Sequence, residues 1–102
     1  MLSSITTTTT SEIEFMIDDI EVEQYINNII NNFYVSTKIK YQNKDQASRE
    51  KSNVDFFRFN LLQWRIDAIS RRLKKSKSKR IRGIHFSKII TIEWEIQAII
   101  DG

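Results

Sequence analysis

Apolar side chains recur at steps of three and four residues in three separate stretches of the chain, which is the period of an amphipathic α-helix. We therefore expect three helices, near residues 12–34, 54–75 and 86–100. Each would bury one face against the other two and leave its polar face in water. The pattern predicts a small all-α domain, spanning residues 11–102.

The first helix is expected to start at a capping box, with Ser11 as the N-cap and Glu14 three residues later. A break at Asp18 is the alternative, with Asp19 starting a second helix. The apolar face of this stretch consists of Val22, Tyr25, Ile26, Ile29, Ile30 and Phe33.

The second helix is expected to start at Asn53, a favourable N-cap residue, with Asp55 close to the positive end of the helix dipole. One face carries Phe59, Leu62, Ile66, Ile69 and Leu73. We expect this face to be widened by Phe57, Leu61, Trp64 and Ala68. Trp64 is therefore predicted to be substantially buried.

The third stretch fits two structures. As a helix with Ser87 as its N-cap, it has one apolar arc, formed by Ile89, Ile92, Ile96, Ile99 and Ile100. As a strand, residues 90–96 alternate between apolar and polar positions. Residues 97–100 continue the helical arc and no partner strand is evident, so the helix is favoured. Gly83 is expected to break the chain ahead of this element.

Two polar segments lack apolar residues to pack. Residues 1–10 include a run of five threonines, and we expect them to form a disordered tail. Between Gln42 and Asn53 the only apolar residue is Ala47. This pattern predicts a flexible connection over residues 36–53, with a short exposed helix over residues 44–51 as the alternative.

Composition narrows the possible chemistry. A chain of 102 residues with 40% hydrophobic content suits one small domain. It has no cysteine, so it offers neither a disulfide framework nor a thiolate metal site, and His85 is its only histidine. No apolar run approaches the roughly 20 residues of a membrane span, and the N-terminus does not resemble a secretory signal. We expect an intracellular protein without membrane contact.

Charge is distributed unevenly along the chain. Residues 71–82 hold eight cations and no carboxylate, whereas the first cation of the chain, Lys38, follows six carboxylates, and the net charge is only +3. A dense basic run beside a helix is typical of a polyanion binder, and nucleic acid is the commonest polyanion. A solvated linker or a localisation signal is the alternative.

An arginine stripe joins this basic run, because Arg58, Arg65 and Arg72 are spaced seven residues apart and so share one face of a helix. We expect most of these cations to contact phosphates, with base contacts from ordered side chains such as Arg65 or Arg72. The candidate nucleic-acid-binding residues are Arg58, Arg65, Arg71, Arg72, Lys74, Lys75, Lys77, Lys79, Arg80 and Arg82.

Catalysis finds little support in the sequence. The carboxylates lie on polar faces or cluster at a helix start, and none is flanked by the apolar surroundings that raise a pKa. The chain has two glycines, so a glycine-rich phosphate loop is excluded. We expect no enzymatic activity, no cofactor, no metal and no small-molecule substrate.

Residues 69–75, Ile-Ser-Arg-Arg-Leu-Lys-Lys, resemble the basic end of a homeodomain recognition helix. Asp67, Ala68 and Ser70 stand where that family has its Trp, Phe and Asn. The small size, the Thr- and Asn-rich composition and the three-helix plan are similar to the mating-type homeodomain-like regulators of social amoebae. That resemblance implies a divergent homeodomain-like or helix-turn-helix fold and a nuclear protein. It also implies binding to duplex DNA and regulation of transcription in cell fate or mating type.

A non-enzymatic protein-interaction or inhibitor module that binds a charged partner is the alternative function. The acidic N-terminal helix would then fold back on the basic run, or bind a protein partner or a second copy in a homodimer. A phosphate binder loses affinity for DNA steeply as salt rises, through counterion release, so salt dependence discriminates between the two functions.

Overall fold

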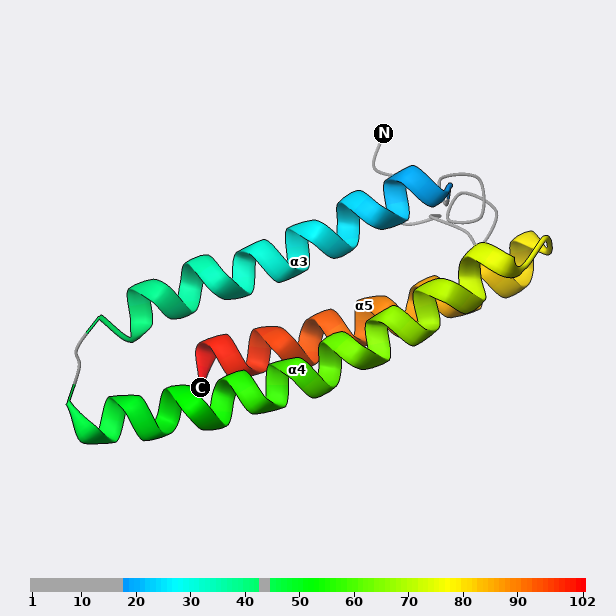
Figure 1. Cartoon of the computed structure of the whole chain (residues 1–102). Helices are drawn as coiled ribbons and strands as arrows, with labels where there is room; N and C mark the ends of the chain where they lie inside the picture. Colours follow the sequence, from blue (N-terminus) through cyan, green and yellow to red (C-terminus); the bar gives the residue numbers. More distant parts are fainter. Residues whose placement is uncertain (1–17, 43–44) are drawn as a thin grey trace, which may run out of the picture.

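The computed structural model describes residues 18–42 and 45–102, and over these ranges its regular secondary structure is α-helical throughout. Three helices follow one another, α3 (Asp19–Lys40), α4 (Gln46–Lys75) and α5 (Lys79–Asp101), and they lie lengthwise beside one another (Figure 1). The expected all-α class and the helical alternative for residues 86–100 are confirmed. The Thr-rich tail and the capping box at Ser11 lie outside the described residues.

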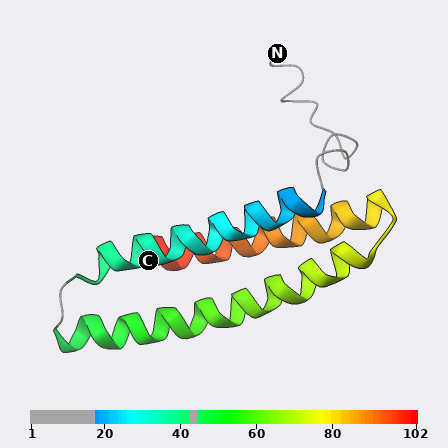
Figure 2. The same ribbon diagram turned by 45° about the horizontal axis from the view of Figure 1, so that its top comes forward.

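The core is formed by the three faces that the sequence predicts. α5 contacts both other helices, and its longest contact is with α4, with which it forms an antiparallel hairpin (Figure 2). The rings of Phe33 and Phe59 stack in parallel with centroids 3.8 Å apart and join α3 to α4. The fully or almost fully buried apolar side chains are Val22, Ile26, Ile29, Phe33, Phe59, Ile66, Leu73, Ile89, Ile92, Ile96 and Ile99.

The start of α3 agrees with the expected alternative at Asp18. The Asp18 side chain accepts a hydrogen bond from the Glu21 backbone N–H at 2.7 Å and so caps the helix that begins at Asp19. Asp19 and Glu21 in the first turn, and Lys38 and Lys40 in the last, all complement the helix dipole. α3 ends at Lys40, beyond the expected boundary at residue 34.

The expected connection over residues 36–53 is wrong for most of its length, because α4 begins at Gln46. Asp45, rather than Asn53, is the N-cap, and its carboxylate accepts a hydrogen bond from the Ser48 N–H at 2.7 Å. The first turns bury little apolar surface, but polar side chains bridge them. Gln46 donates to Glu50 at 2.9 Å, and Lys51 pairs with the buried Asp55 at 3.7 Å.

Trp64 contradicts the prediction of burial, since it is 70% exposed. Phe57, Leu61 and Ala68 are exposed as well. The reason is geometric. At about 100° per residue, positions two before or after a core residue lie about 160° around the helix from it. α4 therefore has two apolar faces, and only the face that contains Phe59 packs against α3 and α5.

α5 begins eight residues earlier than Ser87, the expected N-cap. Ser78 is the N-cap, and Gly83 is buried inside the helix instead of breaking the chain. The connection between α4 and α5 is therefore only three residues long, 76–78. This short connection holds the basic run in a tight hairpin.

Candidate nucleic-acid interface

The basic run forms the turn of the α4–α5 hairpin. We call residues 71–80 the hairpin tip: the last turn of α4, the connection 76–78 and the first residues of α5. Arg72, Lys74 and Lys75 occupy the last turn of α4, where cations complement the negative end of the helix dipole. The backbone N–H of Ser76 closes that helix by donating to the carbonyls of Arg72 and Leu73.

The start of α5 is electrostatically unfavourable on its own. Lys79, Arg80 and Arg82 lie in its first turn, which contains no acid, and cations there oppose the positive end of the helix dipole. The Ser78 hydroxyl accepts a hydrogen bond from the Ile81 N–H at 3.4 Å and supplies the cap. The negative end of the α4 dipole and the positive end of the α5 dipole meet at the tip and oppose each other, so its electropositive character comes from the cations.

Arg82 is turned into the tip instead of outward. Its guanidinium donates to the carbonyl oxygens of Leu73 at 2.8 Å and Ser76 at 3.3 Å, and pairs with the Asp19 carboxylate at 2.6 Å. Only 14% of its side chain is exposed. Arg82 therefore ties the end of α4 to the starts of α3 and α5, and its charge is already partnered.

The acidic start of α3 lies against one side of the tip. In addition to the pair between Asp19 and Arg82, Glu23 pairs with Lys74 at 3.2 Å. Arg71 donates from Nε to the Asp67 carbonyl oxygen within α4 at 3.4 Å. The fold thus brings the acidic and basic ends of the sequence together and occupies part of the basic run.

Five tip cations are exposed and their side chains make no ion pair or hydrogen bond of any kind in the described part of the chain: Arg72, Lys75, Lys77, Lys79 and Arg80. They come from both helices and the connection. Five like charges at one end of a narrow hairpin repel one another and attract a polyanion.

The other two candidate arginines lie along the side of α4 and not at the tip. At 1.5 Å per residue, Arg58 is about 25 Å from Lys75. Arg65 is exposed and its Nη1 lies 3.5 Å from Glu95 Oε2 of α5. The arginine stripe is therefore a solvated flank of the hairpin, and only Arg72 of that stripe belongs to the tip.

His85 lies in α5 near the tip. Burial lowers the pKa of its imidazole, and the nearby cations Lys88 and Arg72 lower it further. Its Nδ1 is buried and has no hydrogen-bond partner among the described residues. A neutral imidazole suits this position, because a second proton would add charge to a surface that is already cationic.

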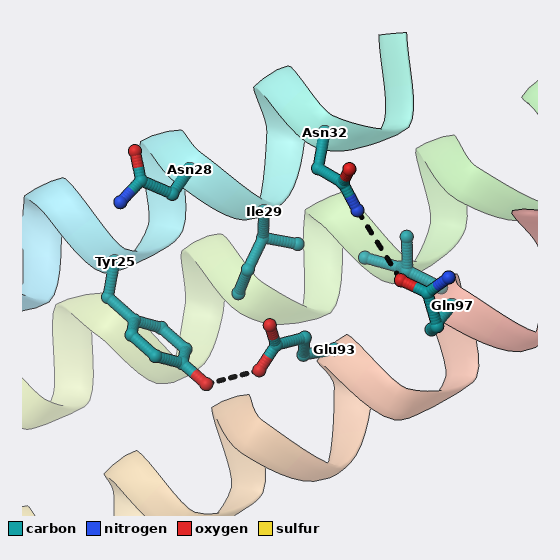
Figure 3. A pocket seen from close by; sticks show the side chains of 7 residues that line it. Tyr25, Asn28, Ile29, Asn32, Glu93 and Gln97 are labelled. Carbon is teal, nitrogen blue, oxygen red and sulfur yellow. Dashed lines mark hydrogen bonds between the residues drawn. The ribbon is translucent and has the colours of Figure 1, made fainter. Parts of the chain in front are cut away.

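A shallow groove of about 330 Å³ between α3 and α5 is a further concave feature (Figure 3). Ile29 and Ile96 supply apolar lining, and polar side chains pair across the two helices. The Tyr25 hydroxyl donates to Glu93, and Asn32 donates to Gln97 at 3.4 Å. Burial, and then the Glu93 carboxylate, raise the pKa of Tyr25. The groove therefore serves to hold α3 on α5.

A similar hydrogen bond links the C-terminal end of α3 to α4. The Tyr41 hydroxyl donates to the buried carboxylate of Asp55. Burial and this carboxylate raise the pKa of Tyr41 to about 12, so the phenol keeps its proton. In residues 18–42 and 45–102, no group of three or more His, Cys, Asp or Glu side chains is arranged to hold a metal ion.

Within the same ranges, no helix combines the length and the apolar character that crossing a membrane requires. Comparisons with protein-family models, with curated proteins and with solved structures found no match to this chain.

Proposed function

We propose that this chain is a non-enzymatic DNA-binding protein that holds the phosphate backbone of duplex DNA at the hairpin tip. The observation that carries the proposal is the group of five exposed tip cations whose side chains make no ion pair or hydrogen bond in the described ranges: Arg72, Lys75, Lys77, Lys79 and Arg80. A protein that neutralises phosphates releases condensed counterions, and this release supplies most of the affinity of non-specific binding.

The tip residues divide by geometry into two roles. Lys77 lies in the connection and Lys79 at the first position of α5, so both supply flexible point charges that suit phosphates. Arg72 lies on the rigid last turn of α4 and offers a fork that fits one guanine edge, worth about 1–3 kcal/mol of discrimination. We assign phosphate contact to the lysines and any base contact to Arg72.

The finer part of the proposal is a nuclear regulator of transcription in cell fate or mating type, and it rests on the resemblance of residues 69–75 to the basic end of a homeodomain recognition helix. Helix-turn-helix motifs cross their two helices at about 90–120°. α4 and α5 instead lie antiparallel and lengthwise (Figure 1). We therefore assign the DNA contact to the end of the hairpin and not to a helix laid along the major groove.

The test is a salt series of binding to a random duplex by fluorescence anisotropy. The variant replaces Lys75, Lys77 and Lys79 with alanine. We expect weaker binding on all sequences alike and a flatter plot of log affinity against log salt. The slope should fall by about 0.9 units for each phosphate that the variant no longer neutralises.

The matched control replaces Lys38, Arg49 and Lys88 with alanine. These residues are exposed, so the control also removes three positive charges, but from positions away from the tip. The control should keep most of the wild-type salt slope. Equal effects of the two triple variants would show that only net charge matters and would refute the assignment to the tip. Absence of binding by the wild-type protein at low salt would refute the proposal and favour the protein-interaction alternative.

A further inference from the structure

The outward face of α4 carries a second apolar stripe, which we call the α4 stripe: Val54, Phe57, Leu61, Trp64 and Ala68. Its steps of three and four residues are those of a heptad repeat. The four larger side chains are 57%, 65%, 47% and 70% exposed in that order. Single exposed apolar residues are common, but a continuous stripe with this period marks a surface that contacts another helix.

We propose that the α4 stripe binds the α4 stripe of a second copy of this chain, as a short parallel two-stranded coiled coil. This inference is independent of DNA binding. The two positions that would continue the repeat are the charged Glu50 and Arg71, so the contact is limited to about two heptads.

The exposed area is sufficient for such a dimer. Aromatic side chains bury about 150–250 Å² each, and a symmetric contact covers Phe57 and Trp64 twice. With Val54 and Leu61 of both copies, the contact reaches about 1,000 Å², near the lower limit of specific protein interfaces. We therefore expect reversible association that depends on protein concentration.

Charges beside the stripe favour the parallel orientation. Arg58, Arg65 and Arg72 follow the stripe on one side, and Asn53, Asn60 and Asp67 follow it on the other. In a parallel pair, each residue of the row Asn53, Asn60 and Asp67 faces the residue five positions later in the sequence of the partner. Asp67 then meets Arg72 of the second copy, and Asn60 meets Arg65 of the second copy, which are attractive combinations.

The antiparallel orientation brings the basic rows of the two copies together. With the two stripes overlapped, Arg58 of each copy then approaches Arg65 of the other, so cations face cations along that side of the contact. The parallel pair instead places both hairpin tips at the same end of the assembly. Lys75, Lys77, Lys79 and Arg80 of both copies then face one polyanion.

Sedimentation analysis of the full chain from low to high micromolar concentration tests the contact. We expect the wild-type chain to dimerise reversibly and to do so at least as well in high salt, because the contact is mainly apolar and salt screens the repulsion between the two tips. Trp64→Glu should weaken dimerisation by about thirtyfold or more, the effect of removing a central aromatic anchor.

Trp94→Glu is the matched control, because Trp94 is also 70% exposed but lies on α5. This variant should dimerise like the wild type. Circular dichroism should show that both variants remain helical. A wild-type chain that is monomeric at every concentration would overturn the proposal and leave the stripe to a different protein. Loss of the dimer in Trp94→Glu alone would also overturn it.

Cysteine cross-linking tests the orientation without replacing a large side chain, and the chain contains no other cysteine. In a parallel pair, the Cα atoms at position 68 come within the roughly 4.4–6.8 Å that a disulfide spans. Ala68→Cys should therefore form a dimer under oxidation, and Ala98→Cys on α5 should not. Failure of Ala68→Cys to cross-link in a chain that dimerises would overturn the parallel arrangement.

Discussion

At the scale of single residues, Arg82 decides the shape of the hairpin tip. Its guanidinium donates hydrogen bonds to two backbone carbonyls at the end of α4 and forms an ion pair with the Asp19 carboxylate of α3. Carbonyls in the last turn of a helix have no partner inside the helix, so an arginine from the next helix is an effective cap. A mostly covered guanidinium of this kind is a structural group, whereas the neighbouring Arg80 is exposed and free to bind a ligand.

We predict that Arg82→Ala destabilises the protein by about 1.5–3 kcal/mol, the usual value of hydrogen bonds to a charged group. Arg80→Ala removes the same charge from an exposed position and should change stability by less than about 0.5 kcal/mol. Denaturant unfolding followed by circular dichroism measures both values. Equal stability of the two variants would show that these contacts of Arg82 contribute nothing.

The sequence pattern predicted the core residues of α4 correctly. It also assigned a second group of apolar residues on α4 to the core, and that group is exposed. The positions of Phe59, Ile66 and Leu73 were correct because a helix period fixes them relative to one another. Trp64 was assigned to the wrong face because hydrophobicity alone does not separate a core contact from an external one. The heptad spacing from Val54 to Ala68 was the signal that would have identified a second, separate stripe.

At the scale of helices, α4 shows that a helix packed in the core can continue into a polar segment that packs against nothing. Residues 46–53 bury almost nothing, yet they continue the helix that begins in the core. Propagation adds one hydrogen bond for each residue fixed, whereas nucleation is costly, so a cap and a few polar pairs are sufficient. Composition predicted a loop here because it contains no information about the packed helix that follows.

We predict that Asp45→Ala frays the start of α4 and leaves its core segment intact. Its carboxylate accepts the Ser48 N–H, and hydrogen bonding to Ser48 lowers the pKa of Asp45. A lowered folded-state pKa means that the cap is present above the usual Asp pKa and is lost as the pH falls through the folded value. Amide exchange measures the effect by residue.

In this variant, exchange should accelerate over residues 46–50 and remain unchanged over residues 59–73. Asp67→Ala is the control, because Asp67 is exposed in the middle of α4, away from both of its ends. It should leave the exchange of residues 46–50 unchanged. Acceleration along the whole helix in Asp45→Ala would mean that the first turns and the core segment unfold as one unit.

At the scale of the whole molecule, the fold redistributes the charge asymmetry of the sequence. Asp19 and Glu23 neutralise two cations at the side of the tip, while the five exposed cations remain at its end. The sequence predicted a basic surface but not this division, because pairing between residues more than fifty positions apart depends on how α3 packs. The expected acidic fold-back and the expected basic surface are both present in the same structure.

The most direct test of the central claim is a titration of the ¹⁵N-labelled chain with a short random duplex, followed through its backbone amide shifts. The account predicts perturbations concentrated at residues 71–80, small changes at Arg58, and reversal of the shifts when salt is added. Perturbations concentrated on the first turns of α4 or on the groove between α3 and α5, with the tip unaffected, would contradict it.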